Sequence, residues 1–180
     1  MRIVLDACVL YPTVMREVLL GAAKKGAFVP LWSARLLEEW RRAAARHSDD
    51  QARVAGVEIA LLKANWPKSE VPVAQVDNLW LPDENDIHVL EIAITSKADV
   101  IMTLNTKDFP SRILSNHGVL RRDPDSFLVE FAHEKPDAMI DVAHDIKQAA
   151  ELHSGESKNI RTLLKRTGLP RLGKFLTAQP

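Results

Sequence analysis

Three aspartates occupy equivalent places along the chain. Asp6 ends a short run of aliphatic residues, Asp86 opens a stretch with helical spacing, and Asp108 follows the apolar run 100–104. In an open parallel sheet, ligands bind outside the carboxyl ends of the strands, so acids placed there converge although they are far apart in sequence. We therefore expect these three side chains to meet at one edge of a sheet.

Carboxylates crowded in this way repel one another unless a divalent cation lies among them. Oxygen-only ligation suits Mg²⁺ or Mn²⁺, and the chemistry such an ion favours is hydrolysis of a phosphodiester. Each acid also has a structural interpretation: Asp108 as a turn residue, Asp83 and Asp86 as helix caps or first-turn acids. Asp6 fits a structural role less easily, because a carboxylate among apolar neighbours needs a partner.

The segments that must hold these acids alternate between strand and helix. Short apolar runs predict buried strands at 2–5, 27–31 and 99–104. Apolar residues at helical spacing predict helices at 13–25, 34–47, 50–65 and 88–97. The proline in 71–76 marks that extended segment as an edge. This order predicts an α/β fold with a mostly parallel central sheet.

From about residue 123 the strand signal fades and helical patterns follow one another. We place the boundary at residue 136, so that 1–135 forms a catalytic domain and 136–180 a helical C-terminal extension. Helical patterns cover 124–134, 137–153 and 157–168, and a short tail covers 169–176.

Composition narrows the class of protein. The 180 residues include 24 Lys and Arg against 24 Asp and Glu, so a uniformly basic nucleic-acid binder is not expected. A single cysteine excludes an intramolecular disulfide and a Cys-rich zinc site. No apolar run reaches the roughly 20 residues that span a bilayer, and we expect a cytoplasmic protein without a membrane partner.

Zero net charge hides a separation of charge along the chain. Residues 77–108 hold seven acids and two bases, whereas the chain from 147 onward holds seven bases and two acids. The basic C-terminal end is either a solvated helix face or a contact for the phosphates of a nucleic acid.

Four sequence features together resemble the PIN domain. They are Asp6 after the first strand, Ser33 followed by Glu38 and Glu39 on a helix, LPDEND (81–86) before a helix, and DVIMTLNTKDFP (99–110). Within that superfamily the chain most resembles the VapC-type ribonuclease toxins of bacterial toxin–antitoxin pairs. The resemblance covers about residues 1–130, with 82–110 its most specific part, and it implies a three-layer PIN-like fold with a helical extension.

The resemblance also implies the site residues. Asp6, Glu39, Asp86 and Asp108 would be catalytic, and the three aspartates would hold Mg²⁺ or Mn²⁺. Glu39 is preferred because it directly precedes an apolar residue, as in the family. Glu38 is the alternative, since adjacent helix positions point about 100° apart and only one can face the site. Secondary candidates are Asp83, Asn105, Thr103 and Ser33.

By this resemblance the protein is a metal-dependent endoribonuclease that cuts RNA and is the toxin of a type II pair. Its partners would be an antitoxin protein and a second copy in a homodimer. Two alternatives stay open at this point: a PIN-fold module that binds RNA or protein without cutting, and a nuclease of the same fold that acts on DNA.

Overall fold

The computed structural model describes residues 1–178, and their contacts gather into two compact units. The first consists of 1–11 and 29–122, and the second of 12–28 and the chain from 123 onward. The helix at 124–134 thus groups with the later helices rather than with the sheet. The grouping of contacts does not test the expected domain boundary at residue 136, which stays a prediction.

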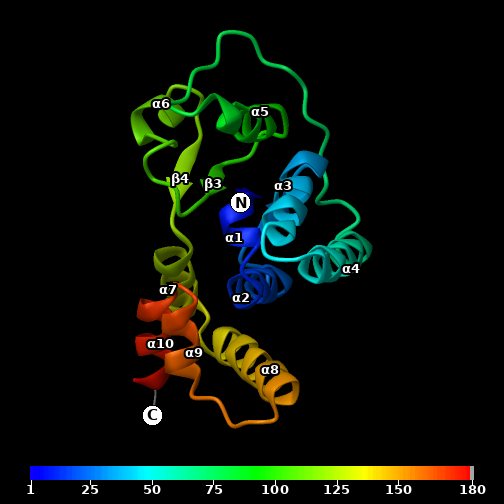
Figure 1. Cartoon of the computed structure of the whole chain (residues 1–180). Helices are drawn as coiled ribbons and strands as arrows, with labels where there is room; N and C mark the ends of the chain where they lie inside the picture. The colour runs from blue at the N-terminus through cyan, green and yellow to red at the C-terminus, as the bar shows by residue number, and fades with distance from the viewer. Residues whose placement is uncertain (179–180) are drawn as a thin grey trace. The chain divides into compact units, whose positions relative to one another are not determined.

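The first unit is built on a parallel sheet with the strand order β2-β1-β3-β4. The strands are β1 (Arg2–Leu5), β2 (Val29–Leu31), β3 (Val100–Met102) and β4 (Leu120–Arg122), and every neighbouring pair is parallel. Figure 1 labels β3 and β4, which are neighbours in this sheet. Val4 of β1 pairs with Leu31 on one side and Ile101 on the other. The α/β fold with a parallel sheet is therefore confirmed, and β1 lies in the middle of it.

Burial explains why β1 occupies this position. Ile3, Val4 and Leu5 are fully buried, as expected of a central parallel strand covered on both faces. Helices of the same unit are α1 (Ala7–Leu10), α3 (Ala34–Ala45), α4 (Asp49–Asn65), α5 (Ile87–Thr95) and α6 (Ser111–Ser115), with a 3₁₀ turn η1 (Glu84–Asp86) before α5.

Helix α3 carries both candidate glutamates, and its position is fixed at two points. The Ser33 hydroxyl caps it by accepting a hydrogen bond from the Leu36 backbone N–H at 3.2 Å. Its apolar face, which includes Leu37 and Trp40, is buried. The helix therefore presents its remaining faces in a fixed orientation.

The structure differs from the sequence prediction at weakly patterned segments. The segment 71–76 forms no strand; the adjoining isolated bridge pairs Trp32 with Glu70. Pro72 has no N–H to donate to a ladder, which explains why the pairing stops there. The short elements β4, α1 and α6 were not predicted. Strand β4 has the largely polar sequence Leu-Arg-Arg, and α1 and α6, of four and five residues, are too short to show a helical period.

The second unit is helical. It contains α2 (Thr13–Lys24), α7 (Pro124–Glu134), α8 (Pro136–Ser154), α9 (Ile160–Arg166) and α10 (Pro170–Thr177). Helices α2 and α8 approach closely at Gly21, where an added Cβ would lie 2.7 Å from a methyl carbon of Val142. Lys25 and Asp141 form an ion pair of 2.8 Å between the same two segments.

A buried aspartate joins α7 to α10. Asp125 is 7% exposed, and its two oxygens accept the backbone N–H groups of Arg171 and Leu172 at 2.9 Å each. Pro170 at the first position of α10 has no N–H to satisfy. Asp125 thus supplies acceptors for the free donors at the start of α10.

None of the helices among residues 1–178 is both long and apolar enough to cross a bilayer.

Candidate active site

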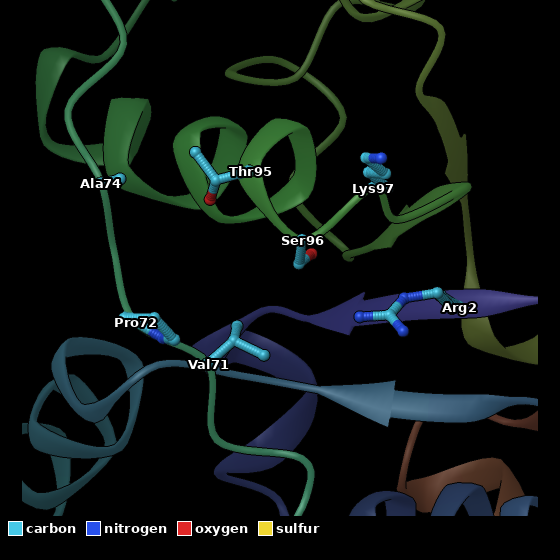
Figure 2. A pocket seen from close by; sticks show the side chains of 7 residues that line it. All are labelled: Arg2, Val71, Pro72, Ala74, Thr95, Ser96 and Lys97. Carbon is cyan, nitrogen blue, oxygen red and sulfur yellow. The ribbon is translucent and has the colours of Figure 1, made fainter.

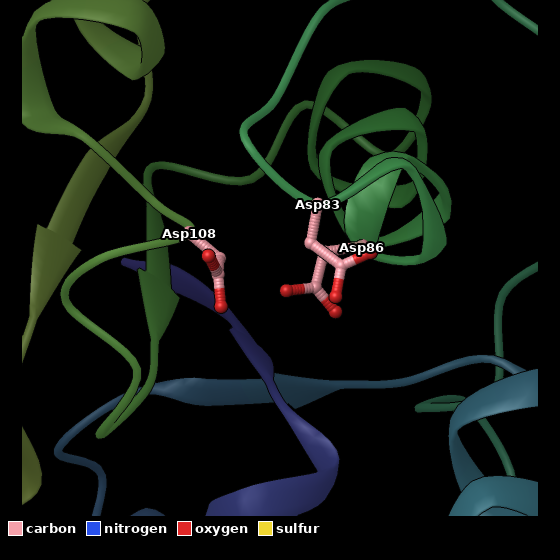
Figure 3. Close-up of side chains that lie close together, drawn as sticks. All are labelled: Asp83, Asp86 and Asp108. Carbon is pink, nitrogen blue, oxygen red and sulfur yellow. The ribbon is translucent and has the colours of Figure 1, made fainter.

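Acidic side chains gather at the carboxyl end of the parallel strands. Asp6 directly follows β1, and its backbone N–H continues the sheet pairing by donating to the Met102 carbonyl at 3.1 Å. Asp108 lies in the loop after β3. Figure 3 shows Asp108 on one side, facing Asp83 and Asp86 at the start of α5. The topology therefore brings acids from separate segments to one edge, as the sequence predicts.

Three carboxylates form the centre of this arrangement. Single oxygens of Asp83, Asp86 and Asp108 all lie within 4.8 Å of one another. Asp83 and Asp86 share one side because the turn between them is 3₁₀, in which residues three apart eclipse. Asp83 also caps that turn, accepting from both the backbone and the side-chain nitrogen of Asn85 at 2.9 Å. We call these three residues the acid cluster.

Asp6 is held by two donors beside the acid cluster. It is 7% exposed, and its Oδ2 accepts hydrogen bonds from Thr103 Oγ1 at 2.6 Å and Cys8 Sγ at 3.1 Å. Burial, followed by the negative charge of Asp6, raises the pKa of the Cys8 thiol to about 12. Cys8 therefore stays protonated as a donor and is not a nucleophile.

Thr103 and Asn105 organise the loop that follows β3. Thr103 is fully buried and, while donating to Asp6, accepts from the Asn105 backbone N–H at 2.9 Å. Asn105 Nδ2 donates to Asp108 Oδ2 at 2.6 Å and lies 3.4 Å from Asp86 Oδ2. Both secondary candidates thus contact the predicted acids directly.

Asp86 is the point at which the negative charges meet. Burial raises its pKa to about 6, and the charges of four other acids add to the effect: Asp6, Asp83, Asp108 and Glu39. Among residues 1–178, no Lys or Arg forms an ion pair with any member of the acid cluster. This negative field is unbalanced, and its oxygen donors suit a hard divalent cation.

Glu39 faces these acids and Glu38 does not. Glu39 Oε1 lies 2.9 Å from Nε2 of His88 on α5 and 3.3 Å from Nε of Arg35. Although burial opposes it, these two contacts leave the pKa of Glu39 below its ordinary value. Glu38 instead pairs with Arg41 and Arg42 on the exposed side of α3, which lowers its pKa to about 2.

Arg35 and His88 connect α3 to the start of α5. Besides contacting Glu39, Arg35 donates from a terminal guanidinium nitrogen to the Asn85 carbonyl at 3.1 Å. His88 is 3% exposed and contacts Glu39 rather than open solvent. Sequence reasoning missed Arg35, although its i,i+4 spacing to Glu39 is a detectable signal. Ser33 takes part only as the cap of α3.

The molecule also has a pocket that no residue of the acid cluster lines. It has a volume of about 550 Å³ and is distinct from the acid cluster. Arg2 begins β1 and Lys97 precedes β3, whereas Val71 donates its N–H to the carbonyl of Trp32 just after β2 (Figure 2). None of the predicted site residues lines it; its lining is Arg2, Val71, Pro72, Ala74, Thr95, Ser96 and Lys97.

Comparison with known families agrees with the geometry. A model of the PIN domain matches residues 2–107, which is more than half of the chain and includes β1, α3, the acid-bearing turn and β3. No curated protein and no solved structure gives a significant match. PIN domains are typically metal-dependent nucleases, and an acid cluster able to bind a metal is present here. With the parallel sheet and its acidic edge, this match shows that the chain belongs to the PIN domain family.

Proposed function

We propose that the protein is a metal-dependent endoribonuclease and the toxin of a type II toxin–antitoxin pair. The observation that carries the proposal is the acid cluster, in which Asp83, Asp86 and Asp108 lie close enough to share one ion. The charges of four other acids, Asp6, Asp83, Asp108 and Glu39, act on Asp86. Carboxylates placed this close together repel one another, which costs free energy. A bound catalytic cation would offset that repulsion.

The residues fit Mg²⁺ or Mn²⁺. Asp86 and Asp108 would hold the ion together with Asp83, which completes the acid cluster, and Asn105 donates to Asp108. The resemblance adds Asp6 as a ligand, although its Oδ2 already accepts from Thr103 and Cys8. When bound, such an ion supplies positive charge to the phosphoryl group and lowers the pKa of water. The donor set is entirely oxygen, which disfavours zinc, whose protein sites are usually built from His and Cys.

The chain's own residues then have separate tasks. Glu39, held by His88 and Arg35, is the carboxylate available to orient a water and accept its proton. Thr103 and Cys8 keep Asp6 in one orientation. Attack of water on phosphorus breaks the bond to O3′, and the products are a 3′-hydroxyl and a 5′-phosphate.

The choice of RNA and the toxin role rest on the resemblance of residues 82–110 to VapC-type toxins. Single-stranded or looped RNA is the expected substrate, since its backbone and bases are open to contact. An antitoxin protein and a second copy of the chain are the proposed partners, and the cytoplasm is the proposed compartment.

The test is cleavage of total cellular RNA by the purified protein, free of any partner, in Mg²⁺, Mn²⁺ or EDTA. Discrete fragments should form only with metal and should vanish in Asp86→Asn. Asp77→Asn is the matched control, because Asp77 is exposed and outside the acid cluster, and it should cut like the wild type.

Two outcomes would overturn the proposal. Cleavage of DNA oligonucleotides in preference to RNA of the same sequence would indicate a DNA-directed nuclease. RNA binding without cleavage in any metal, across total RNA from several growth conditions, would indicate a binding module.

A further inference from the structure

The C-terminal helical hairpin, residues 157–178, carries charge of one sign. From Ser157 onward the chain contains no Asp or Glu. It contains six cations over the same stretch, namely Lys158, Arg161, Lys165, Arg166, Arg171 and Lys174. This density is far above that of the chain as a whole, whose acids and bases balance.

The three cations of α9 are exposed although its Leu164 is buried. Leu164 is fully buried, whereas Arg161, Lys165 and Arg166 are exposed. Arg161 and Lys165 are one turn apart and therefore share a face. The exposed surface of α9 is consequently cationic.

Helix α10 likewise combines buried apolar residues with exposed cations. Leu172 and Gly173 are buried, and Arg171 and Lys174, three residues apart, are exposed. An added Cβ at Gly173 would lie 3.2 Å from the Arg161 carbonyl oxygen, so the two helices touch at this glycine. The close approach places the backbone of Arg161 beside Gly173, which directly precedes the exposed Lys174.

Most of these cations form no ion pair among residues 1–178. Lys158 pairs with Glu156 at 2.9 Å, and Arg171 donates to Ser126 Oγ at 2.6 Å. Within residues 1–178 the side chains of the other four, Arg161, Lys165, Arg166 and Lys174, form no ion pair. Asp125 of α7, which contacts α10, already accepts hydrogen bonds from two backbone N–H groups of that helix.

The hairpin also lacks the features of a membrane or protein interface. No large hydrophobic side chain of 157–178 is exposed; in the second unit the exposed ones are Ile140 and Leu152 on α8. Helices that lie on membranes insert apolar side chains, and protein interfaces are anchored by buried aromatic and apolar residues. A cationic face without such anchors matches a phosphate backbone.

We propose that this hairpin is a binding surface for the phosphate backbone of single-stranded RNA, separate from the acids that would cut it. The choice of RNA over DNA rests on the function proposed above. The surface gives a toxin with zero net charge a local means of holding an anionic substrate.

The test measures binding of a fluorescein-labelled, mixed-sequence RNA oligonucleotide by anisotropy, in EDTA, over a range of KCl concentrations. The variant is Arg161→Gln with Lys174→Gln. Its matched control is Arg46→Gln with Lys68→Gln, which removes the same two charge types from exposed, unpaired positions of the first unit. Circular dichroism should show that both variants keep the wild-type fold.

The hairpin variant should bind about 10- to 30-fold more weakly at 0.1 M salt. The slope of log K against log salt should also be smaller in magnitude by about 1.4, since each single-strand phosphate contact contributes about 0.7. The control should match the wild type. Because EDTA stops metal-dependent cutting, hairpin-dependent binding without nuclease activity would uphold this inference while overturning the proposed function.

Three results would overturn the inference itself. One is an unchanged salt slope in the hairpin variant, and another is equal weakening in the control. The third is hairpin-dependent binding of DNA or of a poly-glutamate peptide that is tighter than binding of the RNA, which would assign the surface to a different partner.

Discussion

Asp125 and Asp86 are both shielded from open solvent, but their surroundings differ. Asp125, in the second unit, has a backbone N–H at 2.9 Å for each of its oxygens. Asp86, in the first unit, has one long contact of 3.4 Å with Asn105 and meets the charges of four other acids. A carboxylate with its donors in place holds the fold together, whereas one surrounded by like charges is poised for a cation from outside.

The largest effect that tests this contrast is on stability. Asp125→Ala leaves two buried N–H groups of α10 without acceptors, and we expect a loss of about 3 kcal/mol in the free energy of unfolding. Urea unfolding followed by far-ultraviolet circular dichroism measures it. All four tryptophans lie in the first unit, so their fluorescence reports whether that unit unfolds at the same urea concentration.

Asp145→Ala is the control for that substitution. Asp145 is an exposed acid of α8, and its removal should change stability by less than about 0.5 kcal/mol. A loss below about 1 kcal/mol for Asp125→Ala would show that its two hydrogen bonds are not what secures α10.

Metal binding is the next effect. A ligand that binds only the folded state stabilises it by about 2.7 kcal/mol at a hundred times its dissociation constant. Mn²⁺ should therefore raise the melting temperature of the wild type, and Asp86→Asn or Asp108→Asn should remove most of that rise. Asp77→Asn should keep it. An undiminished rise in both cluster variants would place the metal elsewhere.

The neighbouring glutamates of α3 give a smaller effect. Glu39→Gln should lower kcat/KM for RNA cleavage by about tenfold or more, because it removes a proton acceptor at the site. Glu38→Gln should change it less than twofold, since Glu38 pairs with Arg41 and Arg42 on the exposed side. Reversed magnitudes would mean that α3 presents its other face to the substrate.

The sequence reveals the acidic edge because strands and their ends are local signals. Asp6 and Asp108 stand directly after or near the end of apolar runs, and parallel topology then brings them together. The resemblance favoured Glu39 over Glu38; that Glu39 contacts Arg35 and His88 depends on the rotation of α3, which only the structure gives. Assignment of catalytic roles to these acids stays a prediction that the assays above decide.

The second unit was less predictable, for a different reason. Its helices are readable from their period, but the pairing of α2 with α8 joins residues more than a hundred positions apart. That contact depends on the absence of a side chain at Gly21, opposite Val142. In the first unit, β4 was unpredictable for a related reason: its sequence, Leu-Arg-Arg, has no apolar alternation, and it forms a strand by pairing with the edge of β3.

The smallest effect is a dependence of stability on pH. The pKa of Asp86 rises from 3.8 to about 6 on folding. Its contribution to stability is therefore present below pH 3.8 and is lost as pH rises through 6. A pKa difference of this size corresponds to about 3 kcal/mol, and solvent screening of a half-exposed carboxylate reduces it to about 1 kcal/mol.

In EDTA, Asp86→Asn should thus be about 1 kcal/mol more stable than the wild type at pH 7 and equal to it near pH 4. Urea unfolding at several pH values measures the difference, and Asp77→Asn should follow the wild-type curve. Mn²⁺ should stabilise the wild type most at pH 7, because a bound cation competes with the proton for Asp86. A stability difference that stays constant with pH would mean that Asn acts by its packing, and the repulsion among the acids would then not be what distinguishes Asp86 from Asp125.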